Sequence, residues 1–163
     1  MDNFKKKLTE KYLAHFDALM ESVAGVKYSK PEISITQKKH IDIIIKYASH
    51  LTEKAEADLM DLYSNSLFSV NKTDNHSELH ILDTTDDLLD HHKMLFEKGF
   101  LSCFESLKKN AGHIYSDDAI KKSIVVNTGT RLEIAKDEFE NWAESIKETK
   151  NEYEYDEENE KNA

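Results

Sequence analysis

The amino-acid sequence predicts an all-α protein, and three observations lead to this class. Glycine and proline are scarce, with four and one among 163 residues, which leaves few positions for the turns of a β protein. Apolar residues recur at intervals of three and four over long stretches, as they do on one face of an α-helix. Apolar residues make up 39% of the chain, which suffices for one core of ordinary size. We therefore expect a single helical domain over residues 1–150.

The first predicted helix covers residues 3–23. Its apolar positions share one face and are Phe4, Leu8, Tyr12, Phe16, Leu19 and Val23. A connection over residues 24–34 follows and contains Gly25 and Pro31. Ser34 and Gln37 have the spacing of a capping box, which marks the start of the next helix.

The second helical stretch covers residues 35–68. Its apolar face contains Ile41, Ile44, Ala48, Leu51, Ala55, Leu59 and Leu62. The pattern fits one continuous helix to Phe68, and it equally fits two helices that bend between His50 and Thr52. Residues 71–75 form a polar break.

The third helix is expected to resume near Ser77 or Thr84 and to continue to Asn110, before a turn at Ala111 and Gly112. Its apolar positions are Ile81, Leu88, Leu89, Leu95, Phe96, Phe100, Cys103, Phe104 and Leu107.

The fourth predicted helix runs from Ser116, its N-cap, to Lys150. Asp117 and Asp118 occupy the first turn, where the helix dipole favours negative charge, and Tyr115 and Ile120 have the spacing of a hydrophobic staple. The inner face of this helix contains Val125, Leu132, Ala135, Phe139, Trp142 and Ile146. Beyond it, residues 151–163 are acidic and poor in apolar side chains, which predicts a disordered tail.

A polar segment interrupts the inner face of the fourth helix. Thr128 occupies an apolar slot, and Gly129 and Arg131, the only arginine, lie beside it. Glycine inside a helix costs about 1 kcal/mol of stability relative to alanine, so we expect Gly129 to serve a specific purpose. We favour a tight crossing of two helices; the alternative is the polar end of a ligand pocket, where Arg131 binds an anion.

Charge and composition narrow the classes of partner. A formal charge of −10 disfavours nucleic acid and anionic membranes, which bind cationic surfaces. The chain shows neither a signal peptide nor an apolar stretch of the roughly 20 residues that span a bilayer, so we expect a cytoplasmic protein. Cys103 is the only cysteine, which excludes an internal disulfide and predicts a buried hydrophobic side chain.

Metal and catalytic motifs are missing from the sequence. The Glu-x-x-His pattern of di-iron bundles and the zinc-protease pattern are both absent. His76, His80, Asp87 and His91 follow a helical stripe that we interpret as a solvated face. Haem is disfavoured, although His50, His80 and His92 are each conceivable axial ligands. We therefore expect no enzyme activity, no cofactor and no metal site.

His92 differs from the other histidines because it lies at the middle of the buried face of the third helix, in register with Leu88 and Leu95. It is interpreted as a core histidine satisfied by one hydrogen bond, or else as a residue that lines a ligand pocket or senses pH. Asp58, at the edge of the second helix's apolar face, is a candidate partner.

Three segments carry a family resemblance: residues 95–100, residues 118–142 with Leu132-Glu133-Ile134, and residues 41–45. They resemble the haem-free globin sensor domains of Bacillus stressosome proteins and sporulation-linked sensor kinases. The resemblance implies a globin-like helical domain without haem, with a long C-terminal helix pair that forms a homodimer; the alternative fold is an antiparallel four-helix bundle. It also implies binding of a small apolar ligand such as a fatty acid, and inhibition of a sensor histidine kinase pathway such as sporulation.

Two sets of residues follow from these expectations. The ligand would meet His92 or Arg131 with its head group, and its apolar wall would comprise Ile44, Leu59, Leu62, Tyr63, Leu88 and Phe96. The dimer interface would comprise Val125, Thr128, Gly129, Leu132, Phe139 and Trp142. The alternative function is an acidic helical-bundle interaction protein, of the immunity or inhibitor type, that binds a basic protein partner.

Overall fold

The computed structural model contains four long α-helices. It describes the backbone over residues 2–24, 35–69 and 75–162, and the side chains over residues 4–23, 35–67 and 84–146. The helices are α1 (Asp2–Ala24), α2 (Lys38–Ser69), α3 (Asn75–Ala111) and α4 (Asp117–Asn162). No strand occurs in these ranges. The all-α prediction is confirmed.

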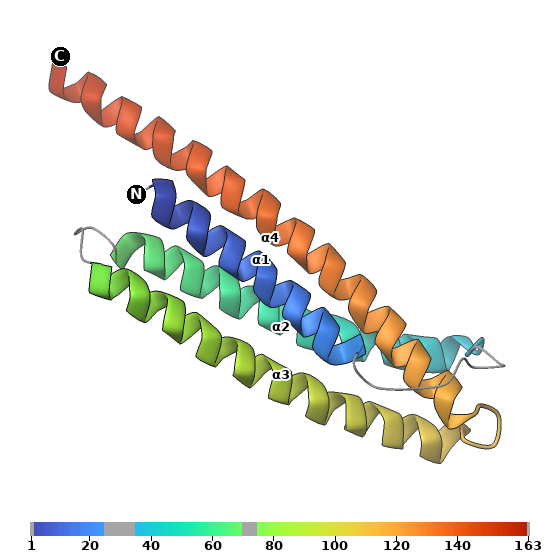
Figure 1. Ribbon diagram of the computed structural model, residues 1–163. Helices are drawn as coiled ribbons and strands as arrows, with labels where there is room; N and C mark the ends of the chain where they lie inside the picture. The colour runs from blue at the N-terminus through green and yellow to red at the C-terminus, as the bar shows by residue number, and fades with distance from the viewer. Residues whose placement is uncertain (1, 25–34, 70–74, 163) are drawn as a thin grey trace.

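The helices form a bundle in which α1 and α3 run in one direction and α2 and α4 run in the other (Figure 1). α1 and α2 each pack against both α3 and α4 and contact each other least, so they lie diagonally across the bundle. This is the four-helix architecture that the sequence left as the alternative. A globin-like arrangement is not supported, because a globin packs eight helices at steeper angles and the described chain forms four long ones.

α2 is one continuous helix, which decides between the two interpretations of residues 35–68. It begins after Gln37, whose carbonyl oxygen accepts the N–H groups of His40 and Ile41 at 3.0 and 3.1 Å. The predicted capping serine Ser34, the connection with Gly25 and Pro31, and most of the polar break lie outside the described residues. α3 begins at Asn75, slightly before the predicted start.

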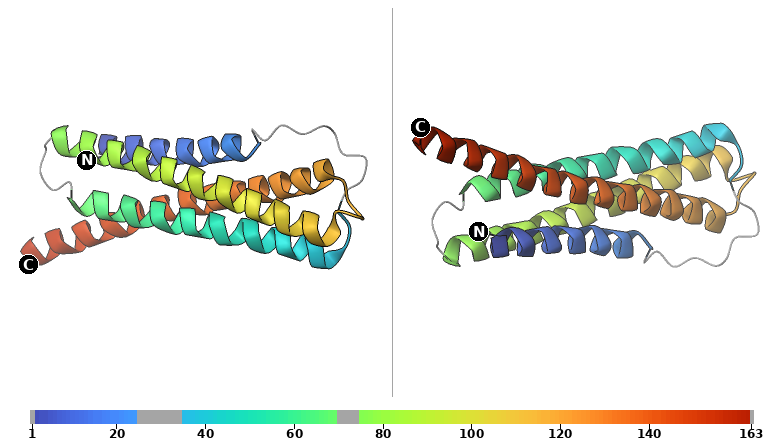
Figure 2. Two further views of the ribbon diagram at one scale, coloured as in Figure 1. Left: turned by 90° about the horizontal axis from the view of Figure 1, so that it is seen from below. Right: turned by 90° about the horizontal axis from the view of Figure 1, so that it is seen from above.

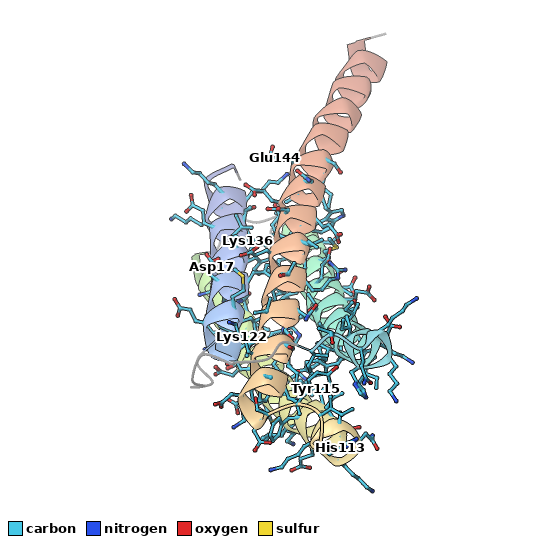
Figure 3. All side chains as sticks on the ribbon, turned by 90° about the vertical axis from the view of Figure 1, so that its right-hand side faces the viewer. Asp17, His113, Tyr115, Lys122, Lys136 and Glu144 are labelled. Atoms are coloured by element: carbon cyan, nitrogen blue, oxygen red, sulfur yellow. The ribbon has the colours of Figure 1, made fainter. Side chains whose placement is uncertain are left out.

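The start of α4 agrees with its sequence signals. The Ser116 hydroxyl accepts the Ala119 N–H at 3.2 Å, which confirms the predicted N-cap. Tyr115 and Ile120 are both buried, as a hydrophobic staple requires. The Tyr115 hydroxyl also accepts the N–H groups of Thr36 and Gln37 at 3.2 and 3.0 Å, and so ties the α3–α4 turn to the start of α2 (Figure 3).

The C-terminal part of α4 diverges from the other three helices and projects beyond them (Figure 2). The sequence predicts a disordered tail over residues 151–163, whereas the helix continues to Asn162. Glutamate is the commonest residue of this segment, and it is a favourable helix former even where no other helix packs against it.

Aromatic rings form the centre of the core. Tyr12, Tyr63 and Phe139 come from three different helices, and their ring centres lie 5.4–5.5 Å apart, within the range of favourable edge-to-face contacts. All six apolar residues predicted on the inner face of α1 are buried. At the surface, Lys136 Nζ lies 2.7 Å from Asp17 Oδ1 at the contact between α4 and α1 (Figure 3).

Candidate functional site

A groove opens between the C-terminal end of α1, the middle of α3 and the first turns of α4. Its volume is about 440 Å³, within the 300–1,000 Å³ that small-molecule sites occupy. Its lining is mostly apolar and comprises Ser22, Val23, Phe96, Glu97, Phe100, Leu101 and Lys121.

Helical spacing explains how the groove acquires its apolar wall. Phe96 and Phe100 are four residues apart on α3, so both lie on the same face, and both are buried. Leu101 lies next to this face and is 57% exposed. The groove therefore offers buried aromatic surface with an accessible leucine beside it.

Lys121, on the second turn of α4, is the cation of the groove. Its ammonium nitrogen lies 5.1 Å from the centre of the Phe104 ring, a distance typical of a cation–π contact. One carboxylate, that of Glu97, also lines the groove. The groove thus combines a mostly apolar wall with the positive charge of Lys121 and the negative charge of Glu97.

The predicted ligand residues do not gather around this groove. Phe96 lines it, whereas Ile44, Leu59 and Tyr63 are fully buried in the core and Leu62 and Leu88 pack against the core. The Tyr63 hydroxyl lies 3.1 Å from that of Thr9, with which it shares a hydrogen bond. These apolar side chains fill the bundle because their helical faces point inward, and they leave no wall for a ligand.

Sequence reasoning missed Leu101 and Lys121, although Leu101 gave a signal. It is a large apolar residue that falls outside the apolar stripe of its helix. Nothing in the sequence distinguishes Lys121 from the lysine that follows it.

His92 forms the predicted pair with Asp58. His92 Nε2 lies 3.0 Å from Asp58 Oδ2, which confirms that α2 and α3 bring these residues together. The side chain of His92 is buried, and burial lowers its pKa although the Asp58 carboxylate opposes this shift. Within the described part of the chain, His92 Nδ1 has no hydrogen-bond partner. The geometry is that of a neutral core histidine anchored through one nitrogen.

A second pair, which the sequence did not reveal, joins α1 to α3. His15 Nε2 lies 3.3 Å from Asp86 Oδ1, and Lys11 Nζ lies 3.0 Å from the same oxygen. Burial lowers the pKa of His15, and the contacts with Lys11 and His15 lower the pKa of the Asp86 carboxyl although desolvation opposes them. We refer to His15–Asp86 and His92–Asp58 as the histidine pairs.

Arg131 is surrounded by carboxylates of its own chain. Its guanidinium nitrogens lie 3.5 Å from Glu53 Oε1, 4.0 Å from Glu56 Oε2 and 3.8 Å from Glu138 Oε1. Glu56 is 7% exposed, and burial together with the neighbouring Glu138 carboxylate raises its pKa to about 7. We refer to these four residues as the Arg131 cluster. Since three internal carboxylates already engage its charge, Arg131 is poorly suited to meet the head group of a ligand.

The polar side chains around Thr128 bond back to their own helix. Asn127 Nδ2, Thr128 Oγ1 and Thr130 Oγ1 donate to the carbonyl oxygens four residues earlier, at 2.7, 2.7 and 2.9 Å. A polar residue therefore fits the apolar slot because its hydroxyl is satisfied without a partner from another helix.

Within one chain no helix approaches Gly129 closely, so a tight crossing there with a second copy stays a prediction. A Cβ atom at this position would have no neighbour within 4 Å. The close approach occurs at Gly99, where a Cβ atom would lie 2.7 Å from Leu51 Cδ1 and 2.8 Å from Tyr47 Cε2. Gly99 is therefore the glycine that packing between α2 and α3 requires.

Most residues of the predicted dimer interface lie in the core of a single chain. Val125, Thr128, Leu132 and Phe139 are buried within a single chain, because the inner face of α4 packs against α1 and α2. Gly129 and Trp142 are partly exposed. Most of the apolar stripe of α4 thus serves the core of its own bundle, and the homodimer stays a prediction.

Other classes of site receive no support from the geometry. Among the described side chains, no three or more histidine, cysteine or acidic residues are grouped so as to hold a metal ion. Burial raises the pKa of the Cys103 thiol to about 11, which makes it a poor nucleophile. In the part of the chain that was searched, no helix has both the length and the apolar character of a membrane span.

Comparison of the chain with protein-family models, curated proteins and solved structures gives no match. The resemblance to haem-free globin sensors therefore stays a prediction.

Proposed function

We propose that the protein binds a small amphipathic anion, such as a fatty acid, in the groove between α1, α3 and α4. The observation that carries this proposal is Lys121, a cation at the side of an otherwise mostly apolar groove. The ligand's apolar chain would contact Phe96 and Phe100, and its carboxylate would pair with Lys121. Glu97, which also lines the groove, disfavours a second negative charge on the ligand.

The two parts of the ligand contribute differently to affinity. Each buried methylene group contributes about 0.8 kcal/mol, whereas a partly exposed ion pair contributes about 0.2–1 kcal/mol. The apolar chain would therefore supply most of the binding free energy. The lysine would determine which end of the ligand faces α4 and would favour an acid over a neutral lipid.

Titration of the full chain with dodecanoate and with dodecanol, followed by calorimetry, tests this proposal. We expect the acid to bind several-fold more tightly than the alcohol. Lys121→Gln should abolish this difference, whereas Lys122→Gln, the same change at the next residue, should preserve it. Equal affinities for acid and alcohol in the unchanged protein would refute the assignment of Lys121.

A pair of matched substitutions on α3 tests whether the apolar wall of the groove contacts the ligand. Leu101→Ser should weaken binding of both ligands several-fold, because Leu101 lines the groove. Met94→Ser removes a similarly exposed apolar side chain of the same helix outside the groove and should leave affinity unchanged. Identical affinities for the two variants would place the ligand elsewhere.

The step from ligand binding to signalling rests on the family resemblance alone. A sensor-like domain of this kind would inhibit a sensor histidine kinase pathway by competing for its signal or partner.

A further inference from the structure

A second surface, separate from the groove, exposes large apolar side chains on α2 and α4. Ile45 on α2 is 45% exposed, and Val126 and Ile134 on α4 are 51% and 46% exposed. A shallow hollow of about 160 Å³ lies between the two helices, and Ile45, Ala48, Ser49, Asn127, Thr130, Arg131 and Ile134 line it. Val126, Thr130 and Ile134 are spaced by four residues and so lie on one side of α4. We refer to this region as the α2–α4 face.

Acidic residues gather around Arg131 and Ile134 at one end of the α2–α4 face, whereas the exposed Lys46 lies next to Ile45. The carboxylates of Glu53 and Glu138 are 64% and 51% exposed, whereas the Arg131 side chain between them is only 19% exposed. Glu133 is also exposed and lies next to Ile134. An exposed apolar patch with a charged rim is characteristic of a protein-binding surface, and here the rim presents acidic groups to solvent.

We propose that the α2–α4 face binds a basic amphipathic helix of another protein. An apolar side chain of that helix would enter the hollow between Ile45 and Ile134, and its lysine or arginine residues would pair with the rim carboxylates. Helices that bind in this way place apolar anchors at intervals of three and four residues in a groove. This inference does not depend on the proposed ligand, since the two sites have no residue in common.

Charge favours such a partner over a second copy of this chain. The chain has a formal charge of −10, and a symmetric dimer through this face would bring the carboxylates of Glu53, Glu133 and Glu138 close to those of the other copy. Like charges that face each other across an interface oppose association. The same carboxylates would attract the lysine and arginine residues of a basic helix.

A fluorescein-labelled amphipathic helical peptide of leucine and lysine is a suitable probe, with fluorescence anisotropy as the readout on the full chain. We expect Ile134→Ser to weaken binding about tenfold, whereas Ile114→Ser, at another exposed isoleucine, should have little effect. Glu133→Lys should weaken binding several-fold more than Asp90→Lys, which makes the same charge change at an exposed position on α3. Circular dichroism confirms that each variant is folded.

Three results would overturn the inference. Equal losses for Glu133→Lys and Asp90→Lys would show that the peptide responds only to net charge. Unchanged binding by Ile134→Ser would show that the hollow takes no apolar anchor. A dimer in sedimentation equilibrium that Ile134→Ser dissociates would assign the face to self-association.

Discussion

The histidine pairs and the Arg131 cluster both place ionisable side chains at contacts between helices, yet their contributions to stability change with pH in opposite directions. In both regions burial disfavours the charged form. For His15 and His92 this lowers the pKa and keeps the imidazoles neutral, whereas for Glu56 it raises the pKa to about 7 and keeps the carboxyl protonated at mildly acidic pH. The comparison shows that one physical cause produces opposite pH responses in an acid and a base.

The signs of the two contributions follow from linkage. Below pH 6.5 the unfolded chain takes up protons that the buried histidines resist, so their contribution to stability is lost as the pH falls toward their lowered pKa values. The folded state holds a proton on Glu56 that the unfolded chain has released, so this contribution is present at pH 4.5 and is lost as the pH rises through about 7. The two regions oppose each other in mildly acidic solution.

Removing the cation of the Arg131 cluster should have the largest effect. Arg131→Met leaves three carboxylates without their counter-charge, and we expect a loss of about 3 kcal/mol of unfolding free energy at pH 8. The loss should be smaller at pH 5, where Glu56 is protonated. Urea denaturation at both pH values measures this. Lys136→Met, which breaks only the surface pair with Asp17, should cost less than about 1 kcal/mol. Equal losses for Arg131→Met at both pH values would contradict the cluster's role.

Replacing the buried imidazole should reduce the acid sensitivity of the histidine pairs. His92→Leu removes the hydrogen bond to Asp58 and should lower stability by about 1–2 kcal/mol at pH 7.5. Between pH 7.5 and 5.5 the variant should lose less stability than the unchanged protein, because one group that resists protonation is gone. His91→Leu, at the exposed neighbouring residue, is the matched control. A pH profile of His92→Leu parallel to that of the unchanged protein would contradict the assignment.

Neutralising Glu56 should have the smallest effect and the opposite sign. Glu56→Gln mimics the protonated carboxyl, so we expect it to stabilise the protein by about 1 kcal/mol at pH 8 and to change little at pH 5. Glu53→Gln, at an exposed carboxylate of the same cluster, should give no such gain. Thermal unfolding at the two pH values distinguishes them, and a Glu56→Gln variant destabilised at pH 8 would show that its charge is needed.

Helical periodicity explains which of these features the sequence could predict. It placed the buried residues of α1, the N-cap at Ser116 and the inward position of His92, because each depends on spacing within a single helix. The pairing of His92 with Asp58 was also within reach, since both lie on faces turned toward the core. The pairing of His15 with Asp86 could not be predicted, because the spacing of residues shows the face of a helix but not its register against another helix.

Contacts between helices account for the features that the sequence could not predict. Gly99 and Gly129 carry the same intrinsic cost within a helix, and only the side chains of Tyr47 and Leu51 distinguish them. The apolar stripe of α4 was assigned to a dimer because the sequence cannot tell whether a partner helix belongs to the same chain. The groove arises where three helices meet, and no single segment contains its pattern.

The length of α4 gives it a mechanical property that the shorter helices lack. From Lys121 to Asn162 it spans ~60 Å at ~1.5 Å per residue, and its far end extends past the bundle (Figure 1). A rigid rod of this length that pivots by ~5° near its start moves its other end by ~5 Å. Lys121 lies on the second turn of α4, beside the groove. A tilt of α4 that began there would displace its projecting end far enough for another molecule to detect.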